Sequence, residues 1–274
     1  MKKSIGSITL IFFILLSIYY LLFEYKRSEF KLYTKITGKH LLFGDKSLLK
    51  NPKILKLERE GYTCYFNTET KSPDLVAYKL KSNWITGKKF YKNRDFKEDN
   101  DKNLPLSAVV SPSDYTSSGY DRGHLARQAD MRGRSTDCEK EALLMTNIAP
   151  QEPNFNRKTW LNLEDVVQKW CIDYDSIWVV CGPWYDEKKE YLKSKNEDIK
   201  IEIPDGFYKI IIKYNDDTIE SNSFLLKQSD TSIKLDKYSV SIDSIESKIG
   251  YDLFPDLDDD DEAKFEASIN LVWN

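Results

Sequence analysis

A helix with one apolar face, preceded by a polar segment, dominates the middle of the chain. Its apolar residues recur at helical spacing from position 160 onward: Trp160, Leu163, Val167, Trp170 and Cys171. This spacing predicts an amphipathic helix over residues 156–174. Prolines at positions 150 and 153 indicate a loop before the helix, so Asn156 is expected in the first turn.

The chain has two histidines, and only one of them lies in a polar constellation. His40 has no acid, serine or cysteine pattern around it, which indicates a packing or surface role. His124 ends a DRGH tetrapeptide that follows a run rich in serine, glycine and tyrosine. Imidazole is the usual general base near neutral pH because its unperturbed pKa is about 6.5. Taken alone, His124 fits a buried imidazole bonded to a backbone carbonyl better than a base.

Basic residues cluster around His124 and at the start of the predicted helix: Arg122, Arg127, Arg132, Arg134, Arg157 and Lys158. Guanidinium groups match phosphate oxygens in a two-pronged geometry, so the cluster predicts a polyanionic ligand. A solvated charged face is the alternative interpretation. The net charge of −3 argues against binding of nucleic acid by bulk charge, which leaves the local cluster to make the contacts.

Asn156 and Glu164 are candidate metal-site residues on the same predicted helix. Eight residues at a rise of about 1.5 Å each separate them by about 12 Å, too far for both to hold one ion directly. A hard cation such as Mg²⁺ keeps most of its waters and takes one or two protein oxygens. Asn156 is therefore predicted as the direct ligand and Glu164 as the residue that holds a water of the ion. A helix cap and a surface carboxylate are the respective alternatives.

With these residues in place, the chain resembles the DNA/RNA non-specific endonuclease family, the ββα-metal nucleases that include endonuclease G and sugar-non-specific bacterial relatives. The resemblance rests on DRGH, on MTNIAPQ at positions 145–151, and on the series Asn156, Trp160, Leu163 and Glu164. It covers roughly residues 61–257. It implies an α+β fold, with a central antiparallel sheet flanked by helices.

The family resemblance also implies roles in hydrolysis of DNA and RNA phosphodiester bonds with little dependence on sequence. His124 is the general base that activates water, and Asn156 is the sole direct protein ligand of Mg²⁺ or Mn²⁺. Glu164 orients metal-bound water, and Arg122 contacts the phosphate.

Three further residues are expected to bind substrate, namely Arg127, Arg157 and Lys71. Lys71 stands where the family often has an arginine. Its ammonium group is a point charge, whereas a guanidinium group can bind phosphate through two N–H groups at once. One alternative function is a membrane-anchored protein of the same fold that binds or takes up nucleic acid without turnover. Another is a catalytic domain that acts on a different phosphodiester, or a toxin held by a partner.

The N-terminal segment is expected to meet a membrane. Residues 4–23 carry no charge, and about 20 apolar residues suffice to span a bilayer. We expect an uncleaved anchor rather than a cleaved signal, with the catalytic domain outside the cytoplasm, periplasmic or extracellular, and a secreted protein if cleavage occurs. The predicted organisation is an anchor or signal (1–27), a tether (28–60), the endonuclease domain (61–257) and an acidic tail (258–274).

Other elements follow from local patterns. We expect a hairpin over residues 61–81, a buried central strand at 176–185, paired strands at 207–214 and 222–227, and a helix at 241–248 capped by Ser241 and ended at Gly250. Residues 82–104 are expected to form an exposed, lysine-rich arm. The four cysteines include no C-x-x-C pair, and an exported chain could join them in up to two disulfides. Cys171 and Cys181 fit packed thiols equally well.

Overall fold

The structure is a computed structural model that describes residues 14–22, 40, 44–186, 188–194, 196, 198–215, 218–270 and 272–273. The chain divides into two compact units, residues 1–38 and 39–274. Within the first unit, residues 14–22 are helical. Over the described part of the chain, no helix has both the length and the apolar character to cross a membrane. Most of the predicted segment at 4–23 lies outside the described residues, so the anchor stays a prediction.

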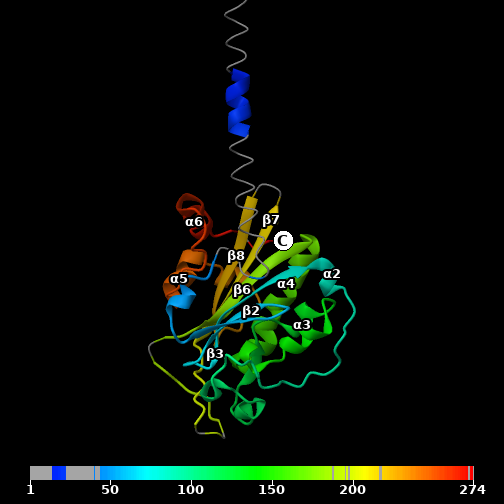
Figure 1. Cartoon of the computed structure of the whole chain (residues 1–274), viewed down its shortest axis with the longest axis vertical. Coiled ribbons are helices and arrows are strands. Elements are labelled where there is room, and N and C mark those ends of the chain that lie inside the picture. Colours follow the sequence, from blue (N-terminus) through cyan, green and yellow to red (C-terminus); the bar gives the residue numbers. More distant parts are fainter. Residues whose placement is uncertain are drawn as a thin grey trace, which may run out of the picture. The chain divides into compact units, whose positions relative to one another are not determined.

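A six-stranded sheet forms the centre of the second unit (Figure 1). Its spatial order is β1-β2-β3-β6-β7-β8, and every neighbouring pair is antiparallel. The strands are β1 (Ile54–Glu58), β2 (Thr63–Asn67), β3 (Ser72–Lys81), β6 (Ser176–Trp184), β7 (Gly206–Asn215) and β8 (Thr218–Lys227). The predicted antiparallel sheet, hairpin, central strand and paired strands are confirmed. The sheet begins at Ile54, ahead of the predicted domain start at residue 61, and the division into four segments stays a prediction.

One face of the sheet buries the long helix that the sequence predicts. Side chains at alternating positions of the strands share a face, so Ile177, Val179 and Cys181 of β6 belong to one core with the apolar stripe of α4 (Leu161–Asp173). A tryptophan anchors the contact. Trp170 stacks on Phe224 with ring centroids 6.3 Å apart. Burial of such large rings contributes most of what holds the helix to the sheet.

Helices cover the sheet on both sides. Figure 1 shows α4 with α2 (Ser82–Ile85) and α3 (Thr136–Glu141) on one side, and α5 (Ile242–Ile249) with α6 (Asp259–Glu266) on the other. The predicted ends of α5 are confirmed. Ser241 Oγ accepts from the Ser244 N–H, and Gly250 adopts a left-handed conformation with φ 75°. The acidic block of the C-terminal tail forms the first turn of α6, where the helix dipole favours negative charge.

Two local structures were not expected from the sequence. A separate two-stranded ribbon pairs β4 (Asp121–His124) with β5 (Ile148–Gln151). The predicted helix also begins as a π-helix, Phe155–Trp160, before α4 continues as a regular α-helix. Short 3-10 turns occupy connecting segments at Leu48–Lys50, Leu106–Ala108, Pro112–Tyr115, Gln128–Met131, Met145–Asn147 and Leu235–Tyr238. All four cysteines are buried free thiols, which agrees with the packed-thiol alternative.

Candidate active site

The β4–β5 ribbon positions the DRGH tetrapeptide. Its antiparallel register pairs Asp121 with Gln151 and His124 with Ile148. The buried side-chain amide of Asn147 holds the backbone that follows His124 in place. Asn147 Nδ2 donates to the carbonyl oxygens of Ala126 (2.8 Å) and Ala142 (2.9 Å), and its Oδ1 accepts from the Ala126 N–H at 2.9 Å. Because these three bonds satisfy the amide, the asparagine of the TNIAPQ motif is explained by its role in fixing the chain beside the ribbon.

His124 is held as a neutral imidazole at the end of β4. Its ring lies 5.0 Å from the ring of Phe96, and its Nε2 atom is buried with no hydrogen-bond partner among the described residues. Burial, followed by the nearby charge of Arg127, lowers the pKa of His124 to about 4. The side chain is therefore deprotonated, and able to accept a proton, throughout the neutral pH range. Phe96 comes from the segment predicted as an exposed arm.

Arg122 shares a face of β4 with His124, because alternate residues of a strand point the same way. Its Nε and Nη2 groups donate to the Pro112 carbonyl oxygen at 3.2 and 2.6 Å. The guanidinium also lies over the rings of Phe96 and Tyr115, 5.6 and 5.9 Å from their centroids. A guanidinium has five N–H donors, so this arrangement fixes its position and leaves donors for an anion.

Asp121 sets the orientation of the Asn156 side chain. Asn156 Nδ2 donates to Asp121 Oδ2 at 2.9 Å, and Arg157 makes a two-pronged ion pair with the same carboxylate at 2.8 and 2.7 Å. A carboxylate in an ion pair only accepts hydrogen bonds, so the NH₂ end of the amide must face it. The carbonyl oxygen Oδ1 of Asn156 is thereby left as the free end. Arg157 is exposed, but its guanidinium group is already paired with the Asp121 carboxylate.

The π-helix changes how Asn156 and Glu164 are oriented. In an ideal α-helix, eight residues make about 2.2 turns, which would point the two side chains about 80° apart. A π-turn takes more residues per turn, so a π-helix over residues 155–160 reduces that offset. The predicted single helix is corrected accordingly, and the correction brings the two side chains nearer to one line.

Glu164 is a buried carboxyl surrounded by charges of both signs. It is 7% exposed, and its Oε2 lies 3.4 Å from Arg127 Nε. Arg127 also pairs with the exposed Asp165 at 2.8 Å. Burial raises the pKa of Glu164 to about 7, although Lys209 and Arg127 act in the opposite direction. At neutral pH this carboxyl is thus near the midpoint of its titration.

Arg127 lies near both His124 and the buried Glu164. Its charge affects the pKa of both His124 and Glu164, and Asn156 contacts the strand that ends in His124. His124, Arg122, Asn156, Arg127 and Glu164 therefore gather around β4 and the start of the helix. No direct contact joins His124 to Asn156 among the described residues.

Two of the basic residues that the sequence singled out, Lys71 and Arg134, make their contacts with other parts of the fold. Lys71 sits in the β2–β3 turn at a positive φ of 61°, and its ammonium group donates to the Thr68 carbonyl oxygen at 2.8 Å. Its role in substrate binding stays a prediction. Arg134 donates to the carbonyl oxygens of Gly61 and Glu60 and lies 4.2 Å from the centroid of the Trp84 ring. Arg134 thus stabilises the fold.

Sequence reasoning missed two buried polar side chains beside the site. Lys209 of β7 is fully buried, with its ammonium 4.3 Å from the centroid of the Trp160 ring, and its charge favours ionised Glu164. Gln151 is fully buried, and neither its Nε2 nor its Oε1 has a hydrogen-bond partner among the described residues. The sequence around Lys209 (PDGFYKIIIKY) and around Gln151 (IAPQ) gives no indication that these side chains are buried.

Gln151 also explains the glycine of DRGH. A Cβ atom at Gly123 would lie 2.2 Å from Gln151 Oε1 and 2.4 Å from its Cγ, closer than any real contact. The buried side chain leaves no room to give way, so residue 123 cannot carry a side chain while Gln151 keeps its place.

The donor set around β4 fits a hard divalent cation. Asn156 offers a carbonyl oxygen turned away from Asp121, Gln151 offers an unbonded buried amide next to Gly123, and Glu164 offers a buried carboxyl. Oxygen ligands of this kind suit Mg²⁺ or Mn²⁺, which retain several waters.

Comparisons with known proteins decide the family. The family model for DNA/RNA non-specific endonucleases matches residues 48–260. The chain belongs to the DNA/RNA non-specific endonuclease family. It is therefore a nuclease, an enzyme that hydrolyses phosphodiester bonds, and its substrate is nucleic acid. The predicted family is confirmed, and membership favours an enzyme over a binding protein without turnover. Nucleases of this family generally depend on a metal.

Individual relatives agree with the assignment. A nuclease of Nostoc sp. is 30% identical over 249 residues, which cover 84% of this chain and 86% of the relative. Mitochondrial endonuclease G of Homo sapiens is 28% identical over 219 residues, 75% of this chain and 72% of the relative. A chain in the crystal structure of an EndoG/EndoGI complex shares the fold, with a TM-score of 0.66, 24% identity, and coverage of 74% of this chain and 86% of that chain.

Proposed function

We propose that this family member is an endonuclease that requires Mg²⁺ or Mn²⁺ and cuts DNA and RNA, with His124 as its general base. One observation carries the proposal. The four-residue strand β4 ends in an imidazole that is neutral at working pH, and begins with the carboxylate that frees Asn156 Oδ1. A base and an oxygen ligand are thus positioned from one short element.

His124 removes a proton from water as the water attacks phosphorus. The lowered pKa keeps the imidazole unprotonated, and the proton that it gains can be stabilised by the negative phosphate. Arg122, fixed by the Pro112 carbonyl, donates its remaining N–H groups to a phosphate oxygen. The attack breaks the bond from phosphorus to the leaving sugar oxygen.

Asn156 Oδ1 would hold the cation directly, with Glu164 bound to its hydration shell and Gln151 beside it. When bound, the cation neutralises charge on the phosphate and on the departing oxygen. Asp121 serves as a positioning residue, because its carboxylate sets the direction of the Asn156 amide.

Lack of sequence preference follows from the kind of contact available. Arg122 and Arg127 present groups that suit the phosphate backbone, and backbone contacts carry no sequence information. We expect products with a 5′-phosphate and a 3′-hydroxyl.

Metal removal tests the proposed function. The purified chain should convert supercoiled plasmid DNA to nicked and linear forms, and should degrade RNA, in millimolar Mg²⁺. Excess EDTA should abolish both activities, and Mg²⁺ or Mn²⁺ should restore them. Cleavage that persists after dialysis against EDTA would contradict a cation-dependent mechanism.

The Mg²⁺ requirement should depend on pH through Glu164. Its raised pKa of about 7 means that a proton competes with the cation below that pH, so the half-activating Mg²⁺ concentration should rise as pH falls from 7.5 to 5.5, by up to about tenfold per pH unit. His124, with a pKa of about 4, does not titrate in this window. The measurement is a Mg²⁺ titration of initial rate at each pH.

Two variants separate this effect from a general change in charge. Glu164→Gln should lower the rate and flatten the pH dependence of the half-activating concentration. Asp165→Asn makes the same charge change at the neighbouring exposed partner of Arg127, and should keep the dependence. An unchanged dependence in Glu164→Gln would show that another group binds the competing proton.

For localisation, we propose that residues 4–23 hold the enzyme at a membrane, with residues 39–274 on its outer, non-cytoplasmic side. The charge-free apolar composition of that segment supports this proposal. Cleavage after the segment would release a secreted enzyme, and the intact mass of the mature protein distinguishes the two.

A further inference from the structure

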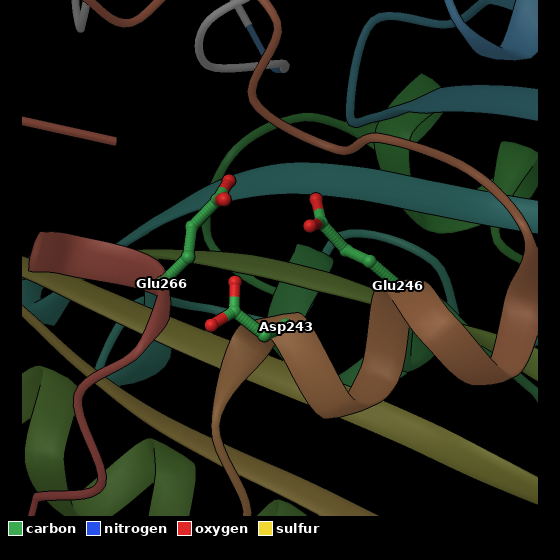
Figure 2. Close-up of side chains that lie close together, drawn as sticks. All are labelled: Asp243, Glu246 and Glu266. Atoms are coloured by element: carbon green, nitrogen blue, oxygen red, sulfur yellow. The ribbon is translucent and has the colours of Figure 1, made fainter. Parts of the chain in front are cut away.

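Five carboxyl groups converge where α5 meets α6, on the other side of the sheet from α4 (Figure 1). One oxygen from each of Asp243, Glu246 and Glu266 lies within 4.8 Å of the others, and the same holds for Asp252, Glu262 and Glu266. Figure 2 shows Glu266 directed from α6 toward the Asp243 and Glu246 side chains of α5. Glu266 belongs to both groups and is therefore their centre.

Glu266 has an oxygen with nothing to bond to. The residue is 6% exposed, and its Oε1 is buried with no hydrogen-bond partner among the described residues. Glu246 uses one oxygen, Oε1, to accept the Leu253 N–H at 2.6 Å. Leaving an acceptor of a carboxylate buried and unbonded is costly, so the geometry favours a ligand at Glu266.

A ligand bound at this place is expected to be positively charged. After burial, the largest influences on the pKa of Glu266 come from other carboxyl groups, in the order Glu246, Glu262, Asp243 and Asp252. Burial and, after it, these carboxyl groups raise the pKa of Glu266 to about 8, and burial raises the pKa of Glu246 to about 7. The fold thus brings like charges together, which either protons or a cation must offset.

We propose that these carboxylates form a Ca²⁺ site centred on Glu266. Ca²⁺ binds six to eight oxygens at about 2.3–2.6 Å, so two of its ligands can lie up to about 5 Å apart, which accommodates oxygens that lie within 4.8 Å of one another. Flexible carboxylates that bind through one or both oxygens suit Ca²⁺. Mg²⁺ requires a near-ideal octahedron and keeps several waters, and Zn²⁺ favours nitrogen and sulfur.

The ion would fasten the C-terminal segment to the domain. Beyond α6, the Trp273 N–H donates to Asn222 Oδ1 at 3.0 Å, and the Trp273 carbonyl accepts from Trp170 Nε1 of α4 at 2.9 Å. Because this segment packs against the helix that carries Glu164, Ca²⁺ at Glu266 stabilises the domain from a place outside the catalytic residues.

Thermal unfolding in saturating Mg²⁺, with and without added Ca²⁺, tests the site on the full chain. Mg²⁺ fills the catalytic site, so a further rise in the midpoint reports a second, Ca²⁺-selective site. We expect a rise on the order of 3–6 °C at a Ca²⁺ concentration ten times Kd. Calorimetric titration of Ca²⁺ under the same conditions should give one site per chain.

Glu266→Gln should lose this rise and the calorimetric signal. Without Ca²⁺ the variant should unfold at the same temperature as the parent or higher, because the amide cannot ionise beside the neighbouring carboxyl groups. Asp260→Asn, an exposed change of equal charge in the same helix, should keep the response.

A parent protein whose midpoint does not respond to Ca²⁺, or a Glu266→Gln variant that responds as fully as the parent, would overturn the proposal. A parent stabilised equally by added Mg²⁺ would overturn the choice of Ca²⁺. Plasmid cleavage in Mg²⁺ is expected to be within twofold of the parent in Glu266→Gln, so failure of this site and failure of the nuclease mechanism are distinguishable.

Discussion

Replacing His124 with alanine should lower kcat on plasmid DNA by about 10²–10⁴-fold, the usual contribution of a general base. The expected loss follows from the position of the imidazole, which is neutral at working pH and lies on the strand that also carries Arg122. Initial rates at saturating Mg²⁺ measure it. Added imidazole should restore part of the rate to His124→Ala, because a small base can enter the space that the side chain occupied.

The second histidine provides the matched control. His40 is buried, and its Nε2 is 3.2 Å from the Arg59 carbonyl oxygen, so its loss affects packing. His40→Ala should change the unfolding midpoint and leave kcat within a few-fold of the parent. If His124→Ala keeps full activity, or if both variants lose activity equally, then His124 is not the base.

Replacing Asn156 with alanine should have the second largest effect, a loss on the order of 10²–10³-fold at fixed Mg²⁺. The amide supplies the oxygen that Asp121 leaves free, so its removal should also raise the half-activating Mg²⁺ concentration. Rates over a Mg²⁺ series, together with calorimetric Mg²⁺ binding, measure both effects.

Asn154 offers a control two residues earlier. It is exposed at the start of the helix and donates to Glu152 Oε1 at 3.3 Å. Asn154→Ala should keep both the rate and the Mg²⁺ requirement. An Asn156→Ala protein that binds and uses Mg²⁺ like the parent would place the cation on other residues.

The sequence is sufficient to predict the elements whose pattern is local. The hairpin of β2 and β3, the buried strand β6 and the ends of α5 follow from alternation, apolar runs and capping residues. The identity of His124 and Asn156 as candidates also came from short motifs. These features depend on side chains close together in the chain, where spacing alone carries the information.

The remainder of the site depends on contacts between distant segments. The role of Asp121 as the partner of Asn156 spans 35 residues, and the approach of Lys209 to Trp160 joins a strand to a helix start. The π-helix could not be read from periodicity, because the apolar stripe that predicts the helix begins at Trp160, where the π-helix ends. The arm at 82–104 was assigned to solvent from its lysines, and its Phe96 lies against His124 instead.

Anomalous diffraction from crystals of the protein soaked in Mn²⁺ tests the central claim most directly, since Mn²⁺ takes the same ligands as Mg²⁺. The account predicts a peak within about 2.2 Å of Asn156 Oδ1, beside β4 and its His124. A strong Mn²⁺ peak elsewhere in the domain, with none bonded to Asn156, would contradict the account.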